Sequence, residues 1–162
     1  MALIRIILSL LYFIFMFSGC KINQRKNGEK VGSWVYKDEL MGITSESKGR
    51  YKKDFEVGVW KDFVGKRLVT KRKYKDSICY TTEYHNNGKI RAVGISKMIV
   101  EDANLHWFLS GEWKFYDSEG ILLGTKIYEK GEPIVETYYR IKIRNYAIIQ
   151  FRRTINAAPL GA

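Results

Sequence analysis

Apolar and polar residues alternate along much of the chain with a period of two, which is the period of a β-strand. Trp113 and Phe115 fall on one face of an extended segment, with the intervening residue on the other face. Trp34 and Tyr36 repeat this pairing nearer the start of the chain. No segment after residue 20 has a convincing helical period. The pattern predicts an all-β domain.

Turn sequences separate the expected strands. Asn87-Gly88 is the dipeptide that a type I′ hairpin favours, because both central residues need positive φ. The stretches 117–120 and 129–132 have a similar turn composition. With two prolines and 14 glycines in the chain, little interrupts the strands. We expect an antiparallel meander built from hairpins.

An internal repeat runs through these strands. Three segments begin with Gly-x-Trp; the first two tryptophans are 26 positions apart, and the second and third are 53 apart. The second gap is almost twice the first, so a degenerate unit is expected around residues 84–89. Residues 65–76 also run parallel to 120–131. The expected repeat core consists of Gly32, Trp34, Tyr36, Gly58, Trp60, Gly111, Trp113 and Phe115.

The sequence order Gly-x-Trp-x-Phe/Tyr-Tyr-Asp, turn glycine, Lys/Tyr and Lys-Gly resembles the MORN repeat. It is more similar to a variant form in bacterial proteins, some of which are described as MORN-like antitoxins. The likeness spans residues 27–132 and implies a single-layer antiparallel sheet in which each hairpin packs its aromatic residues against its neighbours. Two departures stand out: Asp62 replaces an expected aromatic residue, and residues 97–109 form an insertion or a decayed unit.

The N-terminus has the order of a secretory signal. Arg5 precedes an apolar run at 6–17, and the small residues Ser18 and Gly19 follow. Lys21 and the basic residues after it end this run before the roughly 20 apolar residues of a spanning helix. We expect an apolar signal helix over residues 1–19, removed by cleavage.

The sequence Phe17-Ser18-Gly19-Cys20 resembles the lipobox of bacterial lipoproteins, which implies a diacylglycerol on Cys20 and a further acyl chain, such as palmitate, on the new N-terminus. More than one chain is needed, because each buried methylene contributes only about 0.8 kcal/mol. Residues 20–26 would be the lipidated cysteine and a short tether. Lys21, rather than aspartate, follows the cysteine, which favours an outer membrane facing the periplasm if the organism has two membranes. The alternative is an ordinary secretory signal with Cys20 in a disulfide with Cys79.

The remaining chain has the length of one domain. Its MORN-like hairpin repeats cover 27–136, and a basic terminal strand and tail cover 137–162. The chain has a net charge of +11. A basic surface attracts anionic lipid or an acidic partner, and an exported, tethered protein is not expected to bind nucleic acid.

Four residues are candidates for surface binding. Trp107 lies off the repeat period and is the expected exposed aromatic. Arg140, Lys142 and Arg144 alternate with apolar residues in the tail. These basic residues either form the polar face of a strand that caps the array or meet anionic phospholipid, at about 1 kcal/mol each.

The sequence lacks a recognisable catalytic constellation. His85 and His106 do not have the spacing of a metal site. Cys79 lies in a strand-like run without a nearby histidine, which favours a buried, inert thiol. Glu101 and Asp102 would point to opposite faces of a strand. We therefore expect no enzyme activity, no cofactor and no metal site.

These observations favour a lipid-anchored, non-catalytic scaffold that binds an unidentified envelope protein. Two alternatives stay open. The resemblance suggests an antitoxin that neutralises a partner toxin, and Trp107 with the basic residues suggests a binder of envelope glycan or of a phospholipid surface.

Overall fold

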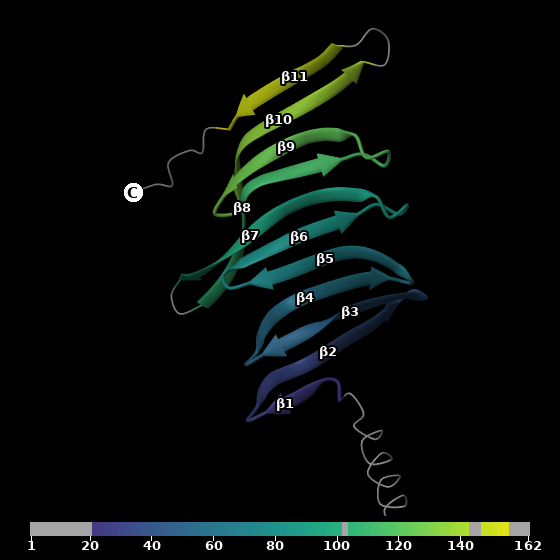
Figure 1. Ribbon diagram of the computed structural model, residues 1–162, viewed down its shortest axis with the longest axis vertical. Coiled ribbons are helices and arrows are strands. Elements are labelled where there is room, and N and C mark those ends of the chain that lie inside the picture. The colour runs from purple at the N-terminus through teal and green to yellow at the C-terminus, as the bar shows by residue number, and fades with distance from the viewer. Residues whose placement is uncertain (1–20, 102–103, 143–146, 156–162) are drawn as a thin grey trace, which may run out of the picture.

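The computed structural model describes residues 21–101, 104–142 and 147–155, which form one antiparallel sheet of 11 strands in chain order (Figure 1). The prediction of an all-β meander is confirmed. The expected signal helix and Cys20 lie outside the described residues. The strands are β1 (Gln24–Lys26), β2 (Glu29–Leu40), β3 (Ile43–Lys52), β4 (Phe55–Val64), β5 (Arg67–Lys75), β6 (Ile78–Tyr84), β7 (Ile90–Glu101), β8 (Asn104–Tyr116), β9 (Leu122–Glu129), β10 (Glu132–Lys142) and β11 (Ala147–Thr154).

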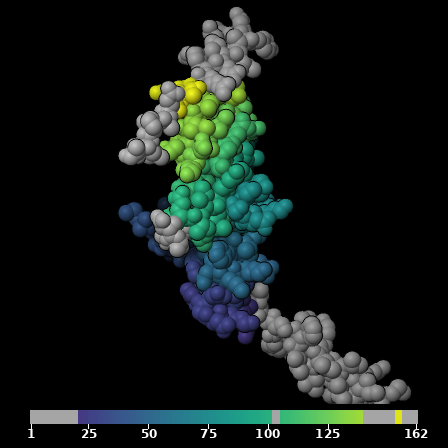
Figure 2. Space-filling view, turned by 90° about the vertical axis from the view of Figure 1, so that its left-hand side faces the viewer, coloured from purple at the N-terminus to yellow at the C-terminus, as the bar shows by residue number. Residues whose placement is uncertain are grey.

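The described strands form a single twisted layer, with no second layer over either face (Figure 1). Figure 2 shows these strands following one another along the long axis of the molecule. Residues directly opposite each other in an antiparallel pair share a face. We call the face that carries Trp34, Trp60 and Trp113 the aromatic face. The opposite side, which carries Lys48, Lys61 and other lysines, is the basic face.

The glycines of the three Gly-x-Trp segments share one conformation. Gly32, Gly58 and Gly111 have φ of 73°, 68° and 65°, which glycine adopts at low cost. In β4 this produces a bulge, because the pairing passes from Lys48↔Lys61 to Arg50↔Val57. The pairing of β7 with β8 has a corresponding register shift, between Val93 and Ile95. In these two segments the glycine therefore lies in a bulge, and the bulge changes the direction of the tryptophan two positions later.

Each bulge places its tryptophan on a glycine of the preceding strand. The ring of Trp60 lies on Gly49, and the ring of Trp113 lies on Gly94, leaving no room for a Cβ. The Trp60 indole N–H donates to the carbonyl of Arg50 at 3.1 Å, and the Trp113 indole N–H donates in the same way to a carbonyl of β7 at 2.9 Å. Both rings are therefore packed, and each indole N–H has a hydrogen-bond acceptor.

The structure buries the three tryptophans of the expected repeat core and leaves its tyrosine partly exposed. Trp34, Trp60 and Trp113 are 8%, 1% and 5% exposed, whereas Tyr36 is 40% exposed. The ring centroid of Tyr36 lies 5.8 Å from that of Trp34 and 6.3 Å from that of Trp60. Because none of the described strands covers the aromatic face, packing against neighbours in the same layer leaves part of Tyr36 in solvent. Phe115 is also only partly buried, 6.5 Å from Trp113.

The turn at Asn87-Gly88 differs from the prediction. Gly88 has φ of 80°, and Asn87 does not have positive φ, so the turn is not type I′. His85 N–H donates to the carbonyl of Lys89, and Gly88 N–H donates to that of His85. The Asn87 side chain explains the difference, because its Oδ1 accepts from Lys89 N–H and its Nδ2 donates to Ser118 in the next turn.

The turn at 117–121 has the same two backbone hydrogen bonds as the turn at 85–89. This equivalence agrees with the degenerate unit expected between the second and third Gly-x-Trp segments. The turn at Lys130-Gly131 does have two positive φ values, 47° and 89°, as type I′ requires.

The two ends of the sheet are more structured than the sequence indicated. The range expected to be the tether, 20–26, contains a strand, because Gln24–Lys26 pairs with β2. Asn23 is also fixed: its N–H donates to Ser33, its Nδ2 donates to the carbonyl of Val35, and its Oδ1 accepts from Val35 N–H. At the other end β11 pairs with β10, so the array closes with two strands rather than one.

Residues 97–109, expected to be an insertion or a decayed unit, lengthen a hairpin. Pairing continues outward from Lys97↔Phe108 to Glu101↔Asn104. Figure 1 shows the β7–β8 hairpin extending past its neighbours at one side of the sheet. This extension carries Trp107.

Candidate binding faces

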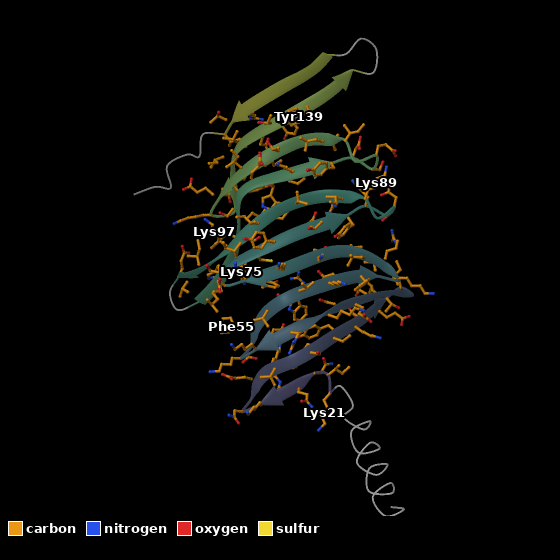
Figure 3. The ribbon with its side chains drawn as sticks, viewed as in Figure 1. Lys21, Phe55, Lys75, Lys89, Lys97 and Tyr139 are labelled. Atoms are coloured by element: carbon orange, nitrogen blue, oxygen red, sulfur yellow. The ribbon has the colours of Figure 1, made fainter. Side chains whose placement is uncertain are left out.

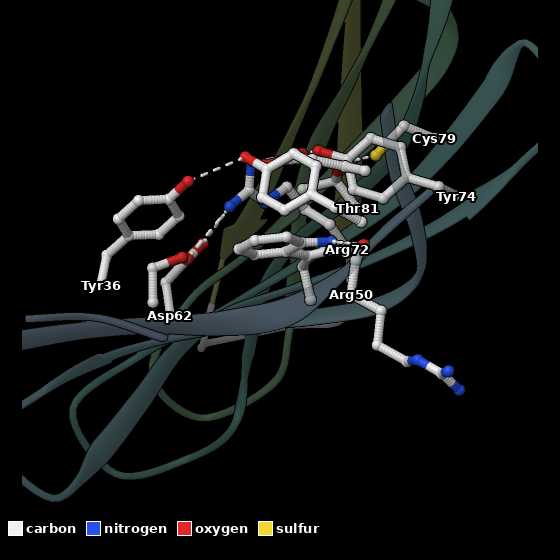
Figure 4. A network of polar contacts seen from close by, with 11 residues as sticks. Tyr36, Arg50, Asp62, Arg72, Tyr74, Cys79 and Thr81 are labelled. Carbon is white, nitrogen blue, oxygen red and sulfur yellow. Dashed lines mark hydrogen bonds and ion pairs between the residues drawn. The ribbon is translucent and has the colours of Figure 1, made fainter. Parts of the chain in front are cut away.

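A polar network on the aromatic face includes Asp62, where the sequence resemblance led us to expect an aromatic residue (Figure 4). Arg72, on the neighbouring strand β5, donates from Nη2 to both carboxylate oxygens of Asp62 at 3.0 Å. Ser47 of β3 donates to the same carboxylate at 2.6 Å. One carboxylate on β4 thus links three neighbouring strands.

The network continues to the buried end of Tyr74. Arg72 Nη1 donates to the Tyr74 hydroxyl at 3.1 Å and lies 3.7 Å from Glu56. Burial, followed by the hydrogen bond with Glu56, raises the pKa of Tyr74. The phenol therefore stays protonated, and this cluster cross-links the strands with neutral and paired groups.

Cys79 contributes a buried thiol to this region. It is 4% exposed, its Sγ lies 3.8 Å from Thr81 Oγ1, and burial raises the pKa of the thiol. A raised pKa reduces the thiolate fraction, which is the nucleophilic form. The position agrees with the buried thiol expected from the sequence.

Trp107 lies beside a hollow on the aromatic face. Its side chain is 42% exposed, and its ring meets that of Tyr74 edge-to-face at 5.4 Å. Met98 is its direct partner on β7. The hollow has a volume of about 540 Å³. Its lining combines apolar and acidic side chains, including Phe55, Met98, Leu105, Trp107, Asp54, Glu56 and Asp76.

The basic face carries a row of lysines across three strands. Lys48 of β3 lies directly opposite Lys61 of β4, which lies directly opposite Lys71 of β5. Lys75 and Lys97 both pair with Ile78 farther along the same face, near one side of the sheet in Figure 3. All five lysines are exposed.

A second hollow, also of about 540 Å³, opens within this row. Lys48, Arg50, Lys61 and Lys71 contribute its charged lining, and Val35 and Val59 contribute apolar surface. Lys48 Nζ lies 2.8 Å from Glu46. Within the described residues, Arg50, Lys61 and Lys71 have no carboxylate oxygen within 4.0 Å.

The remaining predicted residues do not gather into a site. His85 Nε2 lies 2.9 Å from the carbonyl of Tyr116, which ties two units together. Arg140 and Lys142 pair with Ile149 and Ala147 between β10 and β11. Arg144 lies outside the described residues. Among the residues that are described, no group of three His, Cys, Asp or Glu side chains is arranged to hold a metal ion.

Sequence reasoning missed the lysine row and the glycines that receive the tryptophans. The lysines at 48, 61 and 71 are separated by 13 and 10 positions, which is no repeat. Only the strand register brings them into line, through the pairings of β3 with β4 and of β4 with β5.

Comparisons with protein-family models, with curated proteins and with solved structures gave no match. The part of the chain that the structure describes contains no helix long and apolar enough to cross a membrane.

Proposed function

We propose that the protein is a membrane-tethered, non-catalytic module that binds another protein through its exposed sheet. The observation that carries this proposal is the contrast between Trp107 and the repeat tryptophans. Trp107 is 42% exposed, whereas the other three are at most 8% exposed. An aromatic beside a hollow of mixed apolar and polar lining is typical of the anchor points of protein interfaces.

The single-layer architecture supports this proposal physically. Large apolar residues are exposed on the aromatic face, among them Leu105 and Trp107 beside the hollow. Such residues gain free energy when a partner removes them from water, at roughly 25 cal/mol per Å² of apolar surface. A sheet covered on neither side offers that surface without rearrangement.

The tether is a proposal based on the lipobox resemblance and on the anchoring of the first strand. Asn23 is hydrogen-bonded to β2, so only Lys21 and Ile22 separate it from the proposed lipidated Cys20. Three extended residues span roughly 10 Å. A lipid on Cys20 would therefore hold the β1 edge of the sheet close to the bilayer.

A comparison of two aromatic variants tests the binding role. Protein partners would be captured from detergent-solubilised envelopes with wild type, Trp107→Ala and Tyr80→Ala. Tyr80 is a matched control, because it is 47% exposed and lies on the opposite face. We expect Trp107→Ala to lower recovery of a specific partner at least tenfold and Tyr80→Ala to leave it unchanged. Equal recovery with all three would contradict the proposal.

Mass spectrometry of the membrane fraction tests the tether. The expected product begins at an acylated Cys20, and Cys20→Ser should move the protein out of the membrane fraction. Recovery of protein that still begins at Met1 would overturn both cleavage and lipidation.

A further inference from the structure

We propose that the basic face over β3, β4 and β5 docks an acidic segment of a protein partner, whose carboxylates enter the hollow lined by Lys48, Arg50, Lys61 and Lys71. This inference rests on the proposed function, because it specifies the chemistry of a protein partner. It uses the opposite face from Trp107, so the two proposals can fail separately.

The first observation is that like charges lie opposite each other in the lysine row. Lys61 lies between Lys48 and Lys71, its direct partners on the two neighbouring strands. Like charges directly opposite each other destabilise an antiparallel pair. A single glutamate at position 61 would give both neighbouring lysines an oppositely charged partner. The row therefore costs folding stability that one substitution would recover.

Elsewhere the same sheet does pair opposite charges. Lys37 lies directly opposite Glu46, with 3.2 Å between Nζ and Oε2. Lys126 lies directly opposite Glu136, with 2.6 Å between Nζ and Oε1. The lysine row departs from this local rule. Such a departure from stability is typical of surfaces kept for binding.

The second observation is the hollow itself. Lys48 is held by Glu46, whereas Arg50, Lys61 and Lys71 have no ion pair among the described residues. Gly49 adds only backbone to the lining. Three cations thus surround a space of about 540 Å³ that no side chain fills.

The shape of this surface favours an acidic protein segment. Neighbouring strands lie about 4.8 Å apart, so the lysine row is a ladder of donors that side chains on an extended segment can reach. Val35 and Val59 give the alkyl part of a glutamate an apolar contact. A bilayer surface is broad and flat, whereas this hollow lies in a twisted sheet (Figure 1).

The test uses a fluorescently labelled ten-residue glutamate peptide and the purified full-length protein in neutral detergent. We expect saturable binding that weakens at least tenfold between low salt and 0.3 M salt, because screening shortens the range of exposed charges. Lys61→Gln with Lys71→Gln should weaken binding at least tenfold. Lys66→Gln with Lys130→Gln removes the same charge from two exposed turns and should leave the affinity within twofold.

Lys61→Glu is the most informative variant. We expect it to raise the melting temperature, because it pairs Lys48 and Lys71 across the strands, and to reduce peptide binding to the background level. Lys66→Glu, with the same change in net charge, should do neither. Peptide binding that survives Lys61→Glu would overturn the inference.

Two competitors identify other sources of anionic charge. Unlabelled glutamate peptide should displace the probe at lower concentration than inorganic phosphate or short-chain phosphatidylglycerol. Displacement at lower concentration by phosphatidylglycerol or by phosphate would overturn the inference in favour of lipid or of a phosphate ligand.

Trp107→Ala should leave peptide binding unchanged. If the peptide fails to bind while capture of a partner still depends on Trp107, only this inference is wrong.

Discussion

The indole of Trp60 lies directly on the backbone of Gly49 in the neighbouring strand, in a space that a side chain at position 49 would have to enter. Trp113 and Gly94 stand in the same relationship. In a single-layer sheet no opposing layer supplies packing atoms. Burial of the tryptophan to 1% exposure therefore depends on close approach to the strand beside it.

We predict that Gly49→Ala destabilises the fold by about 3 kcal/mol, because a Cβ forces the Trp60 ring from its site and overpacks the strand pair. Gly94→Ala should have a similar effect through Trp113. Urea unfolding followed by tryptophan fluorescence measures both. Ser45→Ala, an exposed change in the same strand as Gly49, should stay within about 0.5 kcal/mol of wild type. A Gly49→Ala protein as stable as Ser45→Ala would contradict the packing described.

The ion pair between Asp62 and Arg72 gives a second prediction. Asp62→Ala should destabilise the sheet by about 2 kcal/mol, since it leaves the half-buried guanidinium without its bidentate partner. The double variant Asp62→Leu with Arg72→Met should be more stable than Asp62→Ala alone. A double-mutant cycle in urea measures the coupling, and additive effects of the single changes would argue against the pair.

Acid should weaken the C-terminal part of the sheet. The hydrogen bond from Lys126, followed by that from Tyr138, holds the pKa of Glu136 below its ordinary value of 4.5. A depressed pKa in the folded state stabilises the protein above pH 4.5, and this contribution is lost as the pH falls through the folded-state pKa. Glu136→Gln should therefore show a shallower loss of stability between pH 5 and pH 3. Parallel pH profiles for wild type and the variant would contradict this.

The first strand gives a prediction about the edge of the sheet. Asn23 donates to and accepts from the backbone of Val35 through its side-chain amide, in the manner of one more strand residue. Asn23→Ala should expose the Val35 N–H and accelerate its hydrogen exchange at least tenfold. Hydrogen exchange at the backbone N–H of Trp34 should change less, because Trp34 pairs with β3. Equal exchange at Val35 before and after the substitution would contradict the edge contact.

The sequence by itself determined the local features of the fold. The period of two established the strands, and the recurrence of Trp34, Trp60 and Trp113 predicted a buried aromatic set. Both inferences depend only on spacing within one strand or one repeat. The exposure of Tyr36 could not be predicted in this way, since it depends on the lack of a covering layer. The turn at Asn87 differed because the Asn87 side chain bonds both to Lys89 in its own turn and to Ser118 in another turn.

Only the tertiary structure decided which residues share a face across strands. A shift of one residue in register would exchange the two faces of a strand, and the bulges in the β3–β4 and β4–β5 pairs contribute to the register there. Lys48, Lys61 and Lys71 have no periodic spacing in the sequence, and they become a row only through that pairing. Gly49 likewise gains its role only when Trp60 is placed over it. Spacing along the chain fixes what one strand presents, whereas the candidate binding face depends on contacts between strands.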